Sequence, residues 1–383
     1  MPLNAESAVK QRYAAAAQAP EACLCSPVDY EQTYLGVIPP EVIQKDYGCG
    51  NPSSYLNPAE TVLDLGSGAG KTCFIAAQIV GPTGRVSGVD MTDEMLTVAR
   101  RNAPIVAERL GYANVEFRKG RIQDLGLDLE KFAADLQANP IRGADSFLAA
   151  EARAEELRVT QPLIPSDSID VVISNCVLNL VDSRAKGQLF AEIFRVLKNG
   201  GRAVIADIVS DEPVPAHLQN DPALWSGCIS GAFTEAGFLQ AFLEAGFYGA
   251  RILRRNSAPW QTVEGIEFRP TTVEAFKGKQ GPCFERNQAV IYKGPFKEVC
   301  DDDHHRFERG QRQAVCDKTY QLLRKSPYRD FFEFVNPRPE IPLDEAKPFD
   351  CSRPPLRHPK ETKGITYNLT TTPSQCCDAG SCG

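Results

Sequence analysis

The feature that most constrains this chain is a group of glycines between a short apolar run and a predicted helix. The apolar run over 61–65 is followed by Gly66, Gly68 and Gly70, and helical periodicity begins at Lys71. Glycine permits positive φ and lets a ligand lie close to the main chain. A glycine loop between a strand and a helix predicts a ligand-binding turn, although a tight turn without a ligand has the same glycines.

Strand and helix patterns alternate beyond this loop. We predict further strands over 84–89, 114–118, 169–175 and 202–209, with helices over 71–80, 92–110 and 184–197. This alternation predicts the α/β class, with a doubly wound, mostly parallel, Rossmann-like sheet. The connection over 125–164 is unusually long and has helical periodicity, so we expect a helical insertion.

We divide the chain into four parts. Residues 1–57 form an N-terminal segment with a helix over 5–19 and a loop at Cys49, and residues 58–212 form the ligand-binding domain with its insertion. Residues 213–297 are predicted as a smaller α+β domain, with a helix over 234–246 and strands over 248–253 and 288–292. Residues 298–383 are a C-terminal extension. It ends in a polar tail, predicted to be unstructured, with Cys376, Cys377 and Cys382.

Composition narrows the range of partners. The 49 acidic residues outnumber the 42 basic ones, giving a net charge of −7. Nucleic acid is therefore disfavoured as a partner, because its phosphates require a basic face. No apolar run approaches the ~18 residues of a membrane span. The first 25 residues lack a secretory signal, so we expect a cytoplasmic protein whose 13 cysteines stay reduced.

The glycine loop favours S-adenosylmethionine over a dinucleotide. Its spacing is G-x-G-x-G rather than G-x-G-x-x-G, and Asp64 before it would repel a pyrophosphate. Asp90 ends the second predicted strand, where a carboxylate can accept the ribose hydroxyls. Over about residues 40–212 the chain resembles class I S-adenosylmethionine-dependent methyltransferases. The resemblance implies a set of cofactor contacts: Asp64, Gly66, Ser67, Gly68, Gly70, Asp90, Met91, Ile122 and Asn175.

Four cysteines distinguish this chain within that class. Cys176 occupies the end of the fourth strand, where methyltransferases for oxygen or nitrogen place a base or a polar clamp. Cys73 follows the glycine loop, and Cys49 and Cys228 lie beside glycines. Together these positions resemble the arsenite S-adenosylmethionine methyltransferases over about residues 45–335. The matching segments are 47–50, 63–73, 174–180 and 227–233, with further similarity at 292–294, 302–305 and 315–316.

The resemblance implies a chemistry for these thiols. Cys49, Cys176 and Cys228 would bind As(III), a soft ion that prefers thiolates, and residues 213–297 would form the arsenic-binding domain. The arsenic lone pair would then attack the methyl group, so no general base is needed. Cys73 would form a disulfide with Cys49 when arsenic is reduced, and glutathione or thioredoxin would restore the thiols.

The sequence is also compatible with other functions. Buried free cysteines are common in protein cores, so the chain could methylate an organic acceptor such as a sterol or quinone. It could also bind metalloids without catalysis. A zinc site is disfavoured because the chain has no C-x₂-C pair, and the Asp301–His305 turn is more typical of a solvated loop than of a metal site. We predict structural roles for the cysteines at six other positions: Cys23, Cys25, Cys283, Cys300, Cys316 and Cys351.

Overall fold

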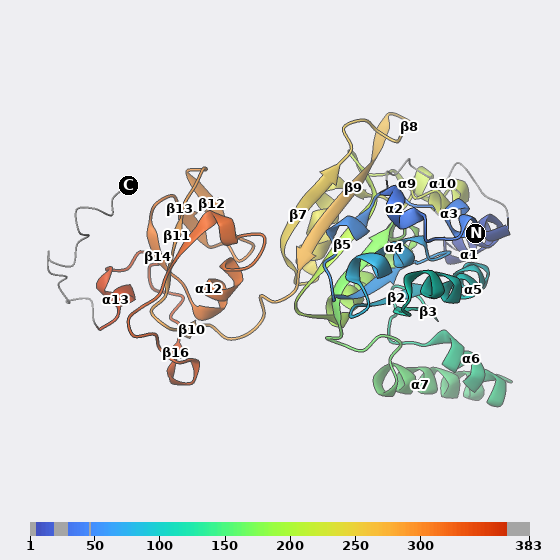
Figure 1. Ribbon diagram of the computed structural model, residues 1–383, viewed down its shortest axis with the longest axis horizontal. Coiled ribbons are helices and arrows are strands. Elements are labelled where there is room, and N and C mark those ends of the chain that lie inside the picture. Colours follow the sequence, from blue (N-terminus) through green and yellow to red (C-terminus); the bar gives the residue numbers. More distant parts are fainter. Residues whose placement is uncertain (1–4, 19–29, 46, 366–383) are drawn as a thin grey trace. The chain divides into compact units, whose positions relative to one another are not determined.

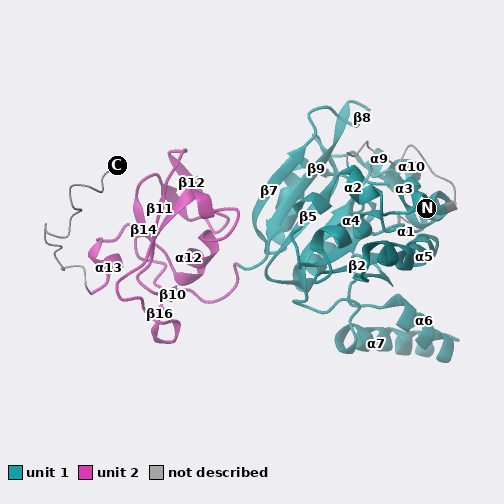
Figure 2. Cartoon of the chain, in the orientation of Figure 1, with its two compact units in different colours: residues 1–278 teal, residues 279–383 magenta. Residues whose placement is uncertain are grey.

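The structure is a computed structural model that describes residues 5–18, 30–45 and 47–365. It divides the chain into two compact units, residues 1–278 and 279–383 (Figure 2). The boundary after Gly278 differs from the one predicted after Lys297. Residues 213–278 do not form a separate unit, because their strands pair with the sheet of the preceding domain.

One sheet organises the first unit. Its strand order is β3-β2-β1-β4-β5-β9-β7, with β6 beside β5 and β8 beside β9. Figure 1 shows the side of the sheet formed by β5, β9 and β7. The strands of this sheet are β1 (Thr61–Leu65), β2 (Arg85–Asp90), β3 (Val115–Lys119), β4 (Ile169–Asn175), β5 (Leu197–Ser210), β6 (Phe233–Thr234), β7 (Tyr248–Arg255), β8 (Gln261–Val263) and β9 (Ile266–Phe276). Strands β1 to β5 are parallel and β9 runs antiparallel to β5, which confirms the predicted doubly wound, mostly parallel sheet.

Alternate side chains of the strands enter two hydrophobic clusters, as expected for a sheet covered on both faces. Val62 packs with α4 (Lys71–Val80) and α5 (Asp93–Leu110), whereas Leu63 packs with α8 (Lys186–Val196) and α11 (Glu235–Glu244). The other helices of the unit are α1 (Ala5–Gln18), α2 (Gln32–Leu35), α3 (Pro40–Gln44), α6 (Leu129–Ala138), α7 (Ala144–Thr160), α9 (Ala216–Gln219) and α10 (Pro222–Ser226). Helices α6 and α7 confirm the helical insertion.

Strand β9 was missing from the sequence prediction. It contains Pro270 and three charged residues, a composition that argues against a central strand. Its charges are nevertheless paired: Glu274 lies 2.7 Å from Arg251, and Arg269 pairs with Glu267. Pairing within the tertiary structure therefore permits a strand that the local pattern disfavours.

The second unit has its own core, formed by Val290, Tyr292, Phe307, Tyr320 and Phe332 among others. Strand β11 (Ala289–Tyr292) lies between β14 (Arg312–Ala314) and β15 (Phe332–Val335). The remaining elements are β10 (Phe284–Glu285), β12 (Glu298–Cys300), β13 (Arg306–Glu308), α12 (Asp317–Leu323), β16 (Lys347–Pro348) and α13 (Lys360–Lys363). The tail cysteines lie outside the described residues. No helix in the described ranges has the length and apolar character needed to cross a membrane.

Candidate active site

A cavity opens where β1, β2 and β4 end. The glycine loop lines it, with positive φ at Gly66, Gly68 and Gly70, and the Gly66 N–H donates to the Val89 carbonyl across 2.8 Å. A side chain at position 66 would collide with Val177. All but one of the predicted cofactor residues line this cavity. The exception is Gly70, which instead begins α4 beside Phe117.

Asp90, at the end of β2, is hydrogen-bonded to the glycine loop. Its carboxylate accepts hydrogen bonds from the main-chain N–H of Gly68 at 2.9 Å and of Thr92 at 2.8 Å. Burial raises the pKa of Asp90, and these two donors counteract the rise. A carboxylate held in this way is fixed in direction, so it can accept hydrogen bonds from a ligand without first reorganising.

The cavity has the properties that S-adenosylmethionine requires. The buried Ser67 hydroxyl has no hydrogen-bond partner among the described residues, which leaves it available to a ligand. Asp64 supplies negative charge suited to a cationic group, and Met91 and Ile122 supply apolar surface for a base. The neighbour Gln123 also lines the cavity, whereas Arg121 pairs with Glu6 of α1 at 2.7 Å.

Three of the four predicted cysteines gather beside this cavity. Cys49 and Cys176 form a disulfide with their Cα atoms 5.7 Å apart, and the Cys228 thiol donates to the Cys176 carbonyl across 3.2 Å. Each of the three is 5% exposed, and they share one apolar cluster with Val9 and Trp225. Cys176 itself lines the cavity. The fold thus brings together thiols separated by up to 179 residues in the chain (228 − 49).

Two of these cysteines have a strained backbone. Cys176 has φ of 63° and Cys228 has φ of 64°, in the left-handed region that residues with a Cβ rarely adopt. Such conformations cost about 1–3 kcal/mol each and concentrate at functional sites. The strain therefore indicates that the orientation of these two residues matters beyond packing.

Asn175 positions the Cys49 loop. Its Oδ1 accepts the N–H groups of Cys49 at 2.9 Å and Gly50 at 3.0 Å, while its Nδ2 donates to the Gly50 carbonyl at 2.8 Å and the Tyr30 hydroxyl at 3.2 Å. The predicted role was cofactor binding. Asn175 does line the cavity, but its side-chain amide is engaged by the loop that carries Cys49.

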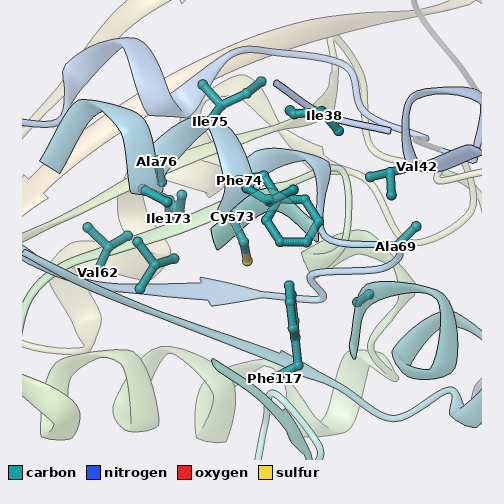
Figure 3. Close-up of a cluster of buried hydrophobic side chains, with 14 of the residues drawn as sticks. Ile38, Val42, Val62, Ala69, Cys73, Phe74, Ile75, Ala76, Phe117 and Ile173 are labelled. Atoms are coloured by element: carbon teal, nitrogen blue, oxygen red, sulfur yellow. The ribbon is translucent and has the colours of Figure 1, made fainter. Parts of the chain in front are cut away.

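Cys73 lies apart from the other three thiols. It is fully buried on α4, in the hydrophobic cluster with Phe74 and Ile173 (Figure 3), and donates to Asp64 across 3.2 Å. Burial raises the pKa of Cys73, and the Asp64 carboxylate raises it further. The Cys49–Cys73 disulfide expected during the reaction is not the one present in this structure, and it stays a prediction. The partner of Cys49 is Cys176, because the Asn175 contacts hold the Cys49 loop against the end of β4.

Sequence reasoning missed two residues of the thiol cluster. The Tyr13 hydroxyl on α1 is hydrogen-bonded to the Cys228 thiol, and a carboxylate oxygen of Asp207 lies within 4.8 Å of both sulfurs of the Cys49–Cys176 pair. Burial raises the pKa of Asp207 to about 6. A lone carboxylate inside the apolar run 203–209 was a usable signal for Asp207. Nothing in the sequence distinguished Tyr13 from other helix residues.

This fold and cavity define a methyltransferase that depends on S-adenosylmethionine. Residues 56–246 match a family described as a methyltransferase domain, and residues 279–367 match one described as a domain of unknown function. The arsenite methyltransferase of Aquipseudomonas alcaligenes is 33% identical over 79% of this chain and 80% of its own length. The chain belongs to the arsenite methyltransferase family.

Two further comparisons agree with this assignment. The arsenite methyltransferase of Mus musculus is 29% identical, over 80% of this chain and 75% of its own length. Among solved structures, the arsenic(III) S-adenosylmethionine methyltransferase of Chlamydomonas reinhardtii is similar with a TM-score of 0.55 at 28% identity. That match covers 85% of this chain and all of the other.

Proposed function

We propose that this chain transfers the methyl group of S-adenosylmethionine to thiol-bound trivalent arsenic and so produces methylated arsenicals. The observation that carries the proposal is the meeting of Cys49 and Cys228 with Cys176, which lines the methyl-donor cavity. An organic acceptor would need a base or polar clamp at this point, whereas a thiophilic ion needs sulfur.

In the reduced site, Cys49, Cys176 and Cys228 would bind As(III) as thiolates and leave its lone pair free. When bound, S-adenosylmethionine supplies an electrophilic methyl group on a positively charged sulfur. The arsenic carries no proton, so the protein needs no general base. Its contribution is to hold the acceptor in line and to exclude water, which the low exposure of the three cysteines supports.

The Cys49–Cys176 disulfide supports a redox role for the same pair. Methyl transfer leaves formal As(V), and two thiolates can return it to As(III) by giving up two electrons and forming one disulfide. A thiol reductant, glutathione or thioredoxin, would then reduce the disulfide to two thiols and leave as its own disulfide. We include a cytoplasmic location in the proposal, because these ligands need a compartment in which thiols stay reduced.

The test is arsenic speciation by chromatography coupled to mass spectrometry. Reduced full-length protein is incubated with arsenite, methyl donor and glutathione, and Cys176→Ser is run in parallel with the exposed control Cys300→Ser. We expect methylated arsenic from the wild type and the control, but none from Cys176→Ser. Stoichiometric arsenite binding without product would instead indicate a non-enzymatic metalloid-binding protein. Absence of both binding and product would favour an organic acceptor.

A further inference from the structure

A second group of cysteines lines a cavity in the second unit. Cys283, Cys316 and Cys351 all lie on its wall, together with Phe307 and Thr319. None of the three takes part in a disulfide. They come from separate segments of the chain, so their meeting is a product of the fold of this unit. The methyl-transfer chemistry described above uses none of them.

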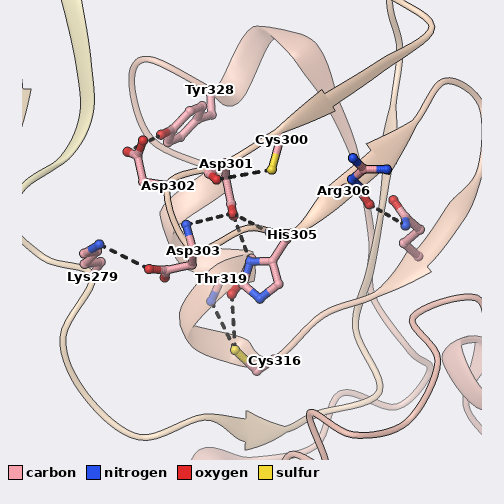
Figure 4. A network of polar contacts seen from close by, with 11 residues as sticks. Lys279, Cys300, Asp301, Asp302, Asp303, His305, Arg306, Cys316, Thr319 and Tyr328 are labelled. Atoms are coloured by element: carbon pink, nitrogen blue, oxygen red, sulfur yellow. Dashed lines mark hydrogen bonds and ion pairs between the residues drawn. The ribbon is translucent and has the colours of Figure 1, made fainter. Parts of the chain in front are cut away.

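Strand pairing and one ion pair bring the segments together. Strands β10 and β16 pair antiparallel, and the Phe349 N–H donates to the Cys283 carbonyl across 2.8 Å. Arg286, just after β10, contacts Asp317 of α12 at 2.8 Å. Cys316 immediately precedes α12, and its sulfur accepts the Thr319 N–H at 3.4 Å (Figure 4). These contacts fix where the Cys283 and Cys316 side chains can lie.

The Cys283 and Cys316 side chains line the same cavity wall, close enough for their thiols to interact. Cys316 is 4% exposed, whereas Cys283 is half-buried at the cavity wall. Burial raises the pKa of Cys316, so this side chain is a protonated thiol at neutral pH. Two adjacent free thiols at a cavity form a dithiol, which can chelate one soft atom.

We propose that Cys283 and Cys316 form a second arsenical-binding site, one that takes trivalent arsenic carrying a single organic substituent. Such an arsenic has two remaining valences, which two thiols satisfy. Two S–H bonds break, two As–S bonds form, and the two protons leave with the arsenic oxygen as one water molecule. Arsenic stays trivalent, so the step needs no oxidant or reductant. The site goes beyond the proposed methyl transfer and does not depend on it.

The test uses phenylarsine oxide on the reduced full-length chain, followed by removal of unbound reagent and tryptic peptide mapping. We expect a phenylarsenic bridge between peptide 280–286, which contains Cys283, and peptide 313–318, which contains Cys316. An arsenic atom held by two thiols dissociates more slowly than one held by a single thiol, because the second As–S bond forms within the complex. The bridged adduct should therefore survive a hundredfold excess of glutathione and be released by a small-molecule dithiol.

Three variants complete the test. Cys283→Ser should lower glutathione-resistant arsenic on these peptides at least about tenfold, as expected when a chelate becomes a single bond. Cys316→Ser should do the same while keeping the helix, because serine is a good N-cap; circular dichroism checks the fold. Cys351→Ser, from the same cavity, should retain the bridge.

The proposal would be overturned if Cys283→Ser retained as much glutathione-resistant arsenic on these peptides as the wild type. It would also be overturned if only Cys351→Ser lost the bridged adduct. A bridge found only at Cys376 and Cys377 would also overturn it. The measurement contains no methyl donor, so it can succeed when the arsenite methylation assay fails, and the reverse.

Discussion

The Cys228 thiol donates to the main-chain carbonyl of Cys176 across 3.2 Å, and both residues have positive φ. The contact joins the end of β4 to the segment that follows α10. Because both cysteines have a constrained backbone, their sulfur positions are set by the fold rather than by free rotation of the chain. We therefore expect this pair to tolerate little change.

Substitution of the four cysteines should separate their roles. Cys176→Ser and Cys228→Ser should abolish methylation of both arsenite and monomethylarsenite, because a hydroxyl is a hard, protonated donor that cannot replace a thiolate. Cys49→Ser should stop only the first methylation, because monomethylarsenite needs one thiolate fewer. Cys73→Ser should do the same, because it removes the disulfide partner predicted for Cys49 during the reaction. The measurement is single-turnover speciation with glutathione present. Wild-type activity of Cys176→Ser on arsenite would contradict the three-thiolate site.

Asp90→Ala should weaken binding of the methyl donor and leave arsenite binding nearly intact. Hydrogen bonds to a charged group contribute about 1.5–3 kcal/mol each, so we expect roughly a tenfold or greater loss of affinity. Isothermal calorimetry measures both ligands. The control Asp93→Ala removes a nearby, more exposed carboxylate that pairs with Lys119 at 2.6 Å. Unchanged donor affinity in Asp90→Ala would remove this residue from the cofactor site.

Asn175→Ala should impair the first methylation more than donor binding, because its amide holds the Cys49 loop. We expect at least about a tenfold fall in the rate with arsenite, the effect of losing a net 1.5 kcal/mol of hydrogen bonding. Ser174→Ala is the matched control, since its hydroxyl donates to the Leu65 carbonyl instead. If Asn175→Ala raised the Kd for S-adenosylmethionine by the same factor as it lowered the methylation rate, Asn175 would belong to the cofactor site.

Tyr13→Phe should shift the pH–rate profile to higher pH. Burial raises the pKa of Cys228 most, Asp207 raises it further, and the hydrogen bond from Tyr13 lowers it. Losing that bond raises the pKa again, so less thiolate is present at any given pH. We expect a threefold to tenfold lower rate at pH 7, from about 0.5–1.5 kcal/mol per hydrogen bond.

The measurement for Tyr13→Phe is the single-turnover rate between pH 6 and 10. Tyr112→Phe serves as the control, because its hydroxyl donates to the Ala77 carbonyl on α4, in a different hydrophobic neighbourhood. Superimposable profiles for Tyr13→Phe and the wild type would show that this hydroxyl does not tune Cys228.

Local pattern was sufficient for much of the first unit. The glycine loop, β1, α4 and β4 have the predicted bounds, because apolar periodicity and glycine position are properties of short segments. The sequence also predicted that one cavity would contain Asp64, Ser67 and Asp90. The ends of neighbouring parallel strands meet at one edge of a sheet, which brings these residues together.

Long-range placement was decided only by the tertiary structure. The sequence by itself identified Cys49, Cys73, Cys176 and Cys228 as candidates but could not rank their distances. The fold placed Cys73, a residue of α4, in the hydrophobic core and paired Cys49 with Cys176. Tyr13 reached Cys228, and Cys283 reached Cys316, through helix packing and strand pairing between distant segments. The spacing of residues along the chain does not predict such contacts. The entropic cost of closing a loop rises only slowly with loop length, so many different pairings have similar costs.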